Sequence, residues 1–185
     1  MKKSLSRPSA VRNRKKKFVF VIGGARSGKS AFALKLASAM PGEKTYMATG
    51  TASDPEMKVR IETHKSSRGN GWKTIEEPRD IAARLTAIGH NGAILLDCLT
   101  LWISNLMQAG LTDDEIMKEA GALAKSCKKA KANVVAVSNE TGLGIVPENR
   151  LARRFREVSG LVNQLMAQEA DSVYLIAAGI PVKIK

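Results

Sequence analysis

The chain has 185 residues, with 30 Lys and Arg against 17 Asp and Glu, two His, two Cys and 44% apolar residues. That length suffices for one compact domain and is too short for two substantial ones, and no apolar run approaches the roughly 20 residues that a membrane helix needs, which excludes a transmembrane protein. Cys98 and Cys127 belong to no Cys-x-x-Cys or Cys/His cluster, so neither a disulfide scaffold nor a zinc site is expected and a cytoplasmic location fits best.

The N-terminal segment holds most of the net charge. Residues 1–17 contain eight Lys and Arg and no acid, so eight of the thirteen excess positive charges lie there. Polar residues between the charges cannot bury enough surface to fold, so we expect a disordered N-terminal extension, followed by a single domain over residues 18–185. A polyanion-binding arm is the alternative to a solvated extension. The chain has eight aromatic residues and none is interleaved with these charges, which disfavours a nucleic-acid partner.

The first half of the domain alternates short apolar runs with helical segments. Phe18 to Ile22 predicts a strand buried on both faces, and the glycines that follow open a loop. The other elements expected here are a helix over Ser30 to Met40, a strand over Thr45 to Thr49, a helix beginning at Asp54-Pro55, a strand over Trp72 to Ile75 and a helix from about Arg79 to Ile88.

The second half continues the alternation. The expected elements are a strand over Ala93 to Asp97, helices over Leu99 to Ala109 and Thr112 to Ala130, a strand over Asn133 to Ser138, a helix over Asn149 to Ala170, and closing strands over Ser172 to Ala178 and Val182 to Lys185. Thr112 and Glu115 form the pattern of a capping box. The order predicts an α/β fold of three layers, with a mostly parallel central sheet covered by helices on both faces.

One motif lies between the first strand and the first helix and matches G-x-x-x-x-G-K-[ST], the phosphate-binding loop of P-loop nucleoside triphosphatases. Its residues are Gly23, Gly24, Ala25, Arg26, Ser27, Gly28, Lys29 and Ser30. Glycines let successive backbone N–H groups point at one anion, next to the positive end of a helix. Lys29 is expected to neutralise the β- and γ-phosphates, and the Ser30 hydroxyl to hold Mg²⁺.

A magnesium ion held by one hydroxyl also needs a carboxylate, which P-loop proteins supply at the end of a hydrophobic strand. Asp97 follows Ala93 to Leu96 and is the candidate. Its alternative role is to cap the helix that starts at Leu99. The Asn-Lys-x-Asp motif of regulatory GTPases is absent from the sequence, so the loop predicts a nucleoside triphosphate without naming its base.

Further motifs resemble one family in the same order along the chain. They are Gly23 to Ser30, Tyr46 to Thr49, Glu56-Met57 with Arg60-Ile61 and His64-Lys65, Trp72 to Pro78, Asp97 to Trp102 with Asn105-Leu106, Val137 to Asn149 and Arg153 to Arg156. From residue 18 to 185 the chain resembles the bifunctional adenosylcobinamide kinase/adenosylcobinamide-phosphate guanylyltransferases of cobalamin biosynthesis. The resemblance implies that ATP or GTP phosphorylates adenosylcobinamide, and that GMP from GTP then passes through an enzyme histidine to the cobinamide phosphate.

The resemblance also implies site residues. His64 stands where the family carries its GMP-accepting histidine, and an imidazole with a pKa of about 6.5 is largely neutral at pH 7, with a free lone pair. His90, the other histidine, is expected to be a solvated loop residue. Nucleotide binding is implied for Ala48, Thr49, Gly50, Lys65, Ser66, Ser67, Arg68, Glu76 and Asp97.

Other expectations stay open between a functional and a structural role. Glu77 either helps Glu76 to bind the nucleotide or supplies charge at a helix start. Arg153, Arg154 and Arg156 are expected to form a surface stripe in large part. The family implies a homo-oligomer, as a trimer, and small-molecule substrates. The competing function is a single-activity P-loop kinase for another metabolite, which would need no histidine nucleophile.

Overall fold

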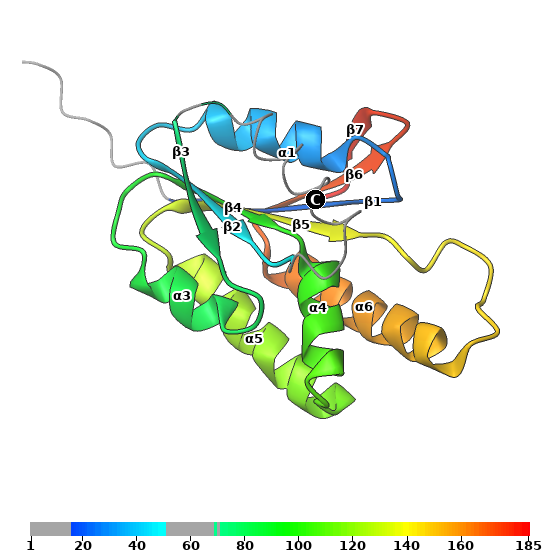
Figure 1. Cartoon of the computed structure of the whole chain (residues 1–185). Coiled ribbons are helices and arrows are strands. Elements are labelled where there is room, and N and C mark those ends of the chain that lie inside the picture. Colours follow the sequence, from blue (N-terminus) through cyan, green and yellow to red (C-terminus); the bar gives the residue numbers. More distant parts are fainter. Residues whose placement is uncertain (1–15, 51–68, 70) are drawn as a thin grey trace, which may run out of the picture.

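The computed structural model of the chain describes residues 16–50, 69 and 71–185. Its sheet has seven strands in the order β3-β2-β4-β5-β1-β6-β7. The strands are β1 (Phe18–Gly23), β2 (Lys44–Ala48), β3 (Trp72–Glu76), β4 (Ala93–Asp97), β5 (Asn133–Asn139), β6 (Ser172–Ala177) and β7 (Ile180–Lys183). Neighbouring strands pair in parallel except β7, which runs antiparallel to β6 (Figure 1). The predicted mostly parallel sheet is confirmed.

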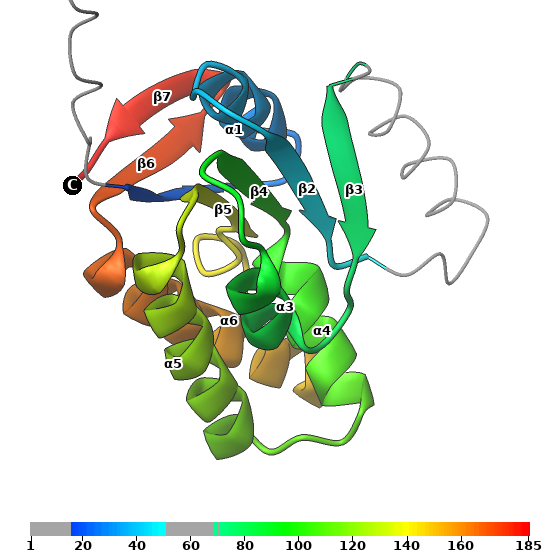
Figure 2. The same cartoon turned by 90° about the vertical axis from the view of Figure 1, so that its left-hand side faces the viewer.

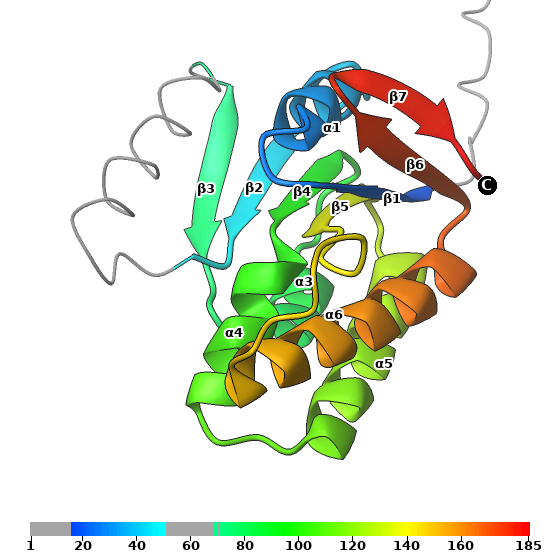
Figure 3. The same cartoon turned by 90° about the vertical axis from the view of Figure 1, so that its right-hand side faces the viewer.

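Helices cover both faces of this sheet, as predicted. Helix α1 (Lys29–Ser38) packs on one face, and α3 (Ile81–Ala87), α4 (Leu99–Gln108), α5 (Asp113–Lys129) and α6 (Arg150–Glu169) lie on the other (Figures 2 and 3). The helix expected to begin at Asp54-Pro55 lies outside the described residues. Among the helices that are described, none combines the length and the apolar character needed to cross a membrane.

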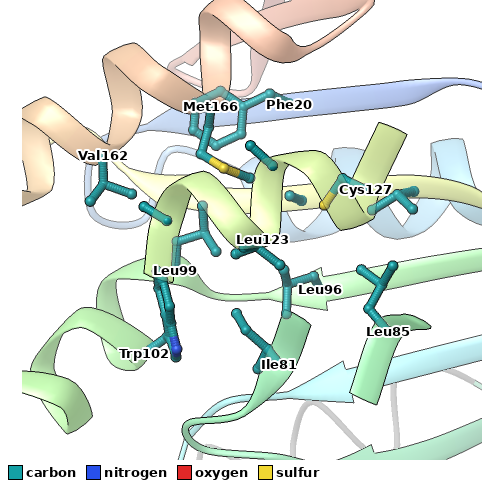
Figure 4. Packing of buried hydrophobic residues seen from close by; sticks show 14 of the residues in the cluster. Phe20, Ile81, Leu85, Leu96, Leu99, Trp102, Leu123, Cys127, Val162 and Met166 are labelled. Atoms are coloured by element: carbon teal, nitrogen blue, oxygen red, sulfur yellow. The ribbon is translucent and has the colours of Figure 1, made fainter. Parts of the chain in front are cut away.

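Side chains on β1 alternate between two cores. Phe18 and Phe20 point into the larger core under α3 to α6, while Val19 and Val21 join the smaller core under α1. Both sets are at most 4% exposed, which is why this strand is apolar at every position. The larger core also holds Trp102 of α4, Leu123 of α5 and Met166 of α6 (Figure 4).

The beginning of α5 has the predicted capping box. The Thr112 hydroxyl accepts a hydrogen bond from the Glu115 N–H at 3.3 Å, and the Glu115 carboxylate accepts one from the Thr112 N–H at 2.8 Å. The Glu115 carboxylate also accepts from the Thr112 hydroxyl at 2.8 Å, and the hydrogen bonds from the Thr112 N–H and hydroxyl hold the pKa of Glu115 below its usual value. The two capping bonds also satisfy two of the N–H groups that a helix start leaves without partners.

Polar side chains fix the amino ends of the strands. The Asn133 carboxamide accepts from the Lys17 N–H at 3.1 Å and donates to the Gly92 carbonyl at 3.2 Å, and Asp171 accepts from the Phe18 N–H at 2.8 Å. The Lys17 carbonyl accepts from the Val134 N–H at 2.9 Å. Lys17 is therefore hydrogen-bonded to the sheet, although it was assigned to the extension expected over residues 1–17. Residues 1–15 of that extension lie outside the described residues.

Candidate active site

The segment between β1 and α1 has the backbone of a tight phosphate-binding loop. Arg26 and Gly28 have φ angles of 54° and 91°, in the left-handed region, and Gly28 is the N-cap of α1. Because glycine has no side chain that could cap the helix, the first N–H groups of α1 keep their capacity to bind an anion. The predicted strand, glycine loop and helix are confirmed.

Gly23 could not be replaced in this loop without a clash. A Cβ atom at Gly23 would lie 2.6 Å from the Ser27 hydroxyl and 2.7 Å from the Ile176 carbonyl oxygen. The Ser27 hydroxyl is buried and has no hydrogen-bond partner among the described residues. The Ser27 carbonyl accepts from the Gly179 N–H at 2.9 Å, which ties the loop to the turn between β6 and β7.

Lys29 is the first residue of α1 and is 8% exposed. Its ammonium group donates to the Gly24 carbonyl at 3.1 Å, so the side chain folds back across the loop. A buried ammonium group is costly unless it is paired or hydrogen-bonded. A polyphosphate bound in the loop would be its negatively charged partner. Ser30 follows on α1 and is half-buried.

Three of the predicted nucleotide-binding residues share one row of the sheet. Ala48, the last residue of β2, pairs with Glu76 of β3 on one side and with Asp97 of β4 on the other. All three stand at the carboxyl ends of their strands, the same edge at which the P-loop leaves β1. In open parallel sheets ligands bind at this edge.

Asp97 does not cap the following helix, which was its alternative role. The N-cap of α4 is Cys98, and its side chain makes no capping hydrogen bond. The Asp97 carboxylate instead accepts a hydrogen bond from the Tyr46 hydroxyl at 3.0 Å. Asp97 is half-buried, and this bond from Tyr46 of the neighbouring strand β2 orients its carboxylate.

Cys98 lies beside this carboxylate but has the wrong protonation state for a nucleophile. Burial raises the pKa of the Cys98 thiol, and the negative charge of Asp97 raises it further. The thiol is therefore neutral near pH 7 and contacts the Thr100 hydroxyl at 3.1 Å. Cys98 has a packing role at this edge.

Thr49 is fully buried, and its hydroxyl is used within the protein. It donates to the Cys98 carbonyl at 2.7 Å and accepts from the Cys98 N–H at 3.0 Å, which joins the ends of β2 and β4. The Asn105 carboxamide donates to the carbonyls of Thr49 and Pro78 at 2.7 and 3.0 Å. Asn105 belongs to the Asn105-Leu106 motif that resembles the family, but no site role was predicted for it, because its long-range partners could not be read from the sequence.

The two neighbouring glutamates have different environments. Glu77 accepts from the N–H groups of Arg79 and Asp80 at 3.0 and 2.9 Å, so it serves the start of α3. Helix α3 begins at Ile81, two residues later than the predicted Arg79, with Asp80 as its N-cap. Glu76 is exposed in the row with Ala48 and Asp97.

The segment that follows β5, residues 140–149, is called the 140–149 loop below. It begins against the P-loop, because the Glu140 N–H donates to the Gly23 carbonyl at 3.0 Å. Arg156 donates to the Gly142 carbonyl at 2.5 Å, and Arg153 donates to the carbonyls of Pro147 and Glu148 at 3.1 and 2.5 Å. These arginines therefore hold the loop backbone.

Arg154 is also bonded within the protein, so the expected surface stripe is wrong for all three arginines. It bonds to the Asp113 carboxylate and to the Leu111 carbonyl, both at 2.7 Å, and so links α6 to the start of α5. All three arginines are half-buried. Their partners are mostly backbone carbonyls, which carry no side-chain signal in the sequence.

The two histidines differ in what the structure describes. His64, with Lys65, Ser66, Ser67 and Arg68, lies outside the described residues. His90 is half-buried at the amino edge of the sheet, not solvated as expected. Its Nδ1 accepts from the Gly92 N–H at 3.1 Å, so Nε2 carries the proton and donates to the Thr45 hydroxyl at 2.8 Å.

Solved structures share this fold at low sequence identity. A protein of Pyrococcus horikoshii OT3 is 8% identical with a TM-score of 0.53, over 91% of this chain and 86% of that chain. A prototypical ATPase from the type III secretion system of pathogenic bacteria is 11% identical with a TM-score of 0.52, over 90% of this chain and 56% of that chain. Both likenesses support the P-loop NTPase-like fold alone.

Sequence relatives are much more similar. The bifunctional adenosylcobalamin biosynthesis protein CobU of Salmonella typhimurium strain LT2 is 44% identical over 180 residues, covering 90% of this chain and 99% of that protein. CobU of Escherichia coli K12 and CobP of Pseudomonas aeruginosa are each 40% identical, over 90% and 89% of this chain and 99% and 95% of those proteins. The sequence model named cobinamide kinase / cobinamide phosphate guanyltransferase matches residues 19–184. The chain therefore belongs to the cobinamide kinase/cobinamide phosphate guanyltransferase family.

Proposed function

We propose that one nucleotide site at the carboxyl edge of the sheet serves both reactions of the family in this chain. The chain phosphorylates adenosylcobinamide with a nucleoside triphosphate, and then transfers GMP from GTP to adenosylcobinamide phosphate, giving adenosylcobinamide-GDP. The observation that carries the proposal is a shared edge of the sheet. Ala48, Glu76 and Asp97 end the neighbouring strands β2, β3 and β4, and the P-loop follows β1 at the same edge. The single-activity kinase has no support in the comparisons.

In the kinase step the P-loop binds the polyphosphate. The first N–H groups of α1 bind phosphate oxygens, and the Lys29 ammonium neutralises charge on the β- and γ-phosphates. The acceptor hydroxyl forms a bond to the γ-phosphorus while the bond to the β-γ bridging oxygen breaks, and the hydroxyl proton leaves to solvent or base. Ala48, Gly50 and Glu76 are proposed to contact the nucleotide at the other end of the same edge, and the buried Thr49 is proposed to position them through its bonds to Cys98 and Asn105.

Magnesium fits the residues at this edge. The Ser30 hydroxyl and the Asp97 carboxylate are hard oxygen donors, and Mg²⁺ in phosphoryl-transfer sites takes one or two protein ligands with phosphate and water oxygens. Such an ion supplies charge neutralisation on the phosphates. Among the described residues, no group of three or more His, Cys, Asp or Glu could hold a metal by itself, which agrees with a site completed by the nucleotide.

The guanylyl step needs a covalent carrier. A nitrogen of His64 attacks the α-phosphorus of GTP, a P–N bond forms, and pyrophosphate leaves with the electrons of the broken P–O bond. A phosphate oxygen of adenosylcobinamide phosphate then attacks the same phosphorus, and the imidazole leaves. Lys65, Ser66, Ser67 and Arg68 are proposed to bind the guanine nucleotide beside His64.

The test compares two histidine variants. His64→Ala should abolish the acid-labile GMP adduct formed from labelled GTP, together with adenosylcobinamide-GDP, while phosphorylation of adenosylcobinamide continues. His90→Ala is the matched control and should form the adduct, because His90 lies at the opposite edge of the sheet. An adduct on the His64 variant, or its loss from a His90 variant that is still folded by circular dichroism, would show that the nucleophile is assigned wrongly.

Two finer points belong to the same proposal. We propose that the chain is located in the cytoplasm. We also propose that it assembles into a homo-oligomer, namely a trimer. The cysteines Cys98 and Cys127 are free and buried, which agrees with a reducing compartment.

The edge strand β7 and the residue that follows it expose Ile180, Val182 and Ile184, with exposed fractions of 64%, 47% and 56%. Such an edge favours pairing with another subunit. Light scattering of the purified chain measures the assembly.

A further inference from the structure

The 140–149 loop exposes large apolar side chains next to the phosphate-binding loop. Leu143, Ile145 and Val146 are 84%, 96% and 61% exposed. Three large hydrophobic residues within four positions are more than the scattered apolar exposure of ordinary surfaces, and such patches mark binding sites. The proposed nucleotide site, formed by the P-loop with Ala48, Glu76 and Asp97, does not include these three apolar side chains.

The backbone of the 140–149 loop is held in place by hydrogen bonds, although its apolar side chains are exposed. Its backbone carbonyls at Gly142, Pro147 and Glu148 accept hydrogen bonds from arginines of α6, and the Gly142 N–H donates to the Glu140 carboxylate at 2.6 Å. The loop therefore has a defined shape while its apolar side chains face solvent. A preformed apolar surface loses little conformational freedom when a ligand binds.

The position of the loop relates this surface to the transferred phosphate. β5 lies between β1 and β4 in the sheet, so its end lies between the P-loop and Asp97. The Glu140 N–H contacts the Gly23 carbonyl at 3.0 Å, and Leu143 follows only three residues later, a chain length of roughly 10 Å. In Figure 1 the loop leaves β5 at the same end of the sheet at which β1 leads into the P-loop.

The chemistry of the loop fits the acceptor and not the nucleotide. Residues 140–149 contain Glu140 and Glu148 and neither Lys nor Arg, so the loop offers no cation to a polyphosphate. A corrinoid is a broad macrocycle edged with methyl and amide groups, and such a molecule gains affinity from burial of apolar surface.

We propose that the apolar surface of the 140–149 loop, formed by Leu143, Ile145 and Val146, binds the corrin macrocycle of the acceptor and orients its hydroxyl toward the phosphate donor. The inference rests on the cobinamide kinase activity of the family. It assigns these residues to substrate specificity and leaves nucleotide chemistry to the P-loop. The two substrates would then meet at the end of β5, each held by its own loop.

The experiment replaces the exposed side chains in the full-length protein. Ile145→Ser should raise the KM for adenosylcobinamide about tenfold, and Leu143→Ser with Ile145→Ser about hundredfold, since burial of one such side chain contributes roughly 1.4 kcal/mol or more. The KM for ATP and formation of the GMP adduct from GTP should not change. Leu161→Ser is the matched control, because Leu161 is 48% exposed on α6, beyond the loop.

A second readout does not depend on turnover. Equilibrium dialysis, with the visible absorption of adenosylcobinamide as the signal, should give weaker binding to the loop variants and unchanged binding to Leu161→Ser. Unchanged corrinoid binding in the loop variants would overturn the inference, and so would a fall in oligomer mass on light scattering, because the surface would then be a subunit contact. If the wild-type chain does not phosphorylate adenosylcobinamide at all, the proposed function itself fails.

Discussion

Polar side chains at the two edges of the sheet serve different purposes. At the amino edge, Asn133, Asp171 and His90 bond to backbone groups or to a buried hydroxyl, and each fixes the start of a strand. At the carboxyl edge, the Ser27 hydroxyl is buried without a partner among the described residues, and Glu76 is exposed in the row with Asp97.

The contrast separates stability from function. Groups whose hydrogen bonds are satisfied within the chain stabilise it, whereas an edge with a glycine-rich loop and polar groups facing outward has capacity left for ligands. Substitutions of Lys29, Ser30 or Asp97 at the carboxyl edge should therefore change catalysis with little effect on folding, whereas Thr49 and Asn105 at that edge are bonded within the chain and also stabilise it. Substitutions at the amino edge should do the reverse.

The largest effect is expected at Lys29. Lys29→Ala should lower kcat/KM for phosphorylation by about 10²-fold or more, because one preorganised group that stabilises charge at the transition state contributes about 3 kcal/mol. Ser30→Ala should have a loss of similar order. Steady-state phosphorylation of adenosylcobinamide measures both. Near-normal rates in both variants would contradict the P-loop assignment.

A smaller effect is expected at Asp97. Asp97→Asn removes a negative charge but keeps an oxygen that can accept the hydrogen bond from the Tyr46 hydroxyl, so the fold should persist. The Mg²⁺ concentration for half-maximal rate should rise about tenfold, which corresponds to roughly 1.4 kcal/mol. A magnesium titration measures it. An unchanged titration curve would remove Asp97 from the metal site.

At the amino edge, His90→Ala should affect stability. The substitution removes the partner of the Thr45 hydroxyl, and Thr45 is 2% exposed. An unsatisfied buried polar group costs about 1 to 3 kcal/mol, and 1 kcal/mol lowers the Tm of a chain of this size by roughly 2 to 4 °C. Thermal unfolding measures the change. Combining the substitution with Thr45→Val should recover part of the loss, and a further decrease would argue against this explanation.

No effect is expected from removal of residues 1–15. The described chain enters the sheet at the amino end of β1, whereas the P-loop follows its carboxyl end. The cut must stop before Lys17, because Lys17 bonds to Asn133 and Val134. Both activities of the truncated chain should equal those of the full chain, and a folded but inactive truncation would show that the extension takes part in catalysis.

Local patterns in the sequence determined most of the fold. Sequence patterns predicted every described strand to within about two residues. The central strands β1, β4 and β5 are apolar at consecutive positions because both of their faces are buried, whereas β3 and β7 are largely exposed edge strands. Glycine and lysine spacing predicted the P-loop, because this spacing lets successive backbone N–H groups and the lysine surround one phosphate. The Thr112 and Glu115 pair predicted a helix start, since both capping bonds form within four residues.

Only the tertiary structure decided which groups meet across the chain. The strand order put Asp97 and Glu76 on either side of Ala48, whereas His90 went to the opposite edge. Arg153 and Arg156 looked like surface charge because their partners, loop carbonyls, carry no side-chain signal. Such contacts depend on how strands are ordered and where a loop returns, and these are properties of the whole packed chain rather than of any short stretch of residues.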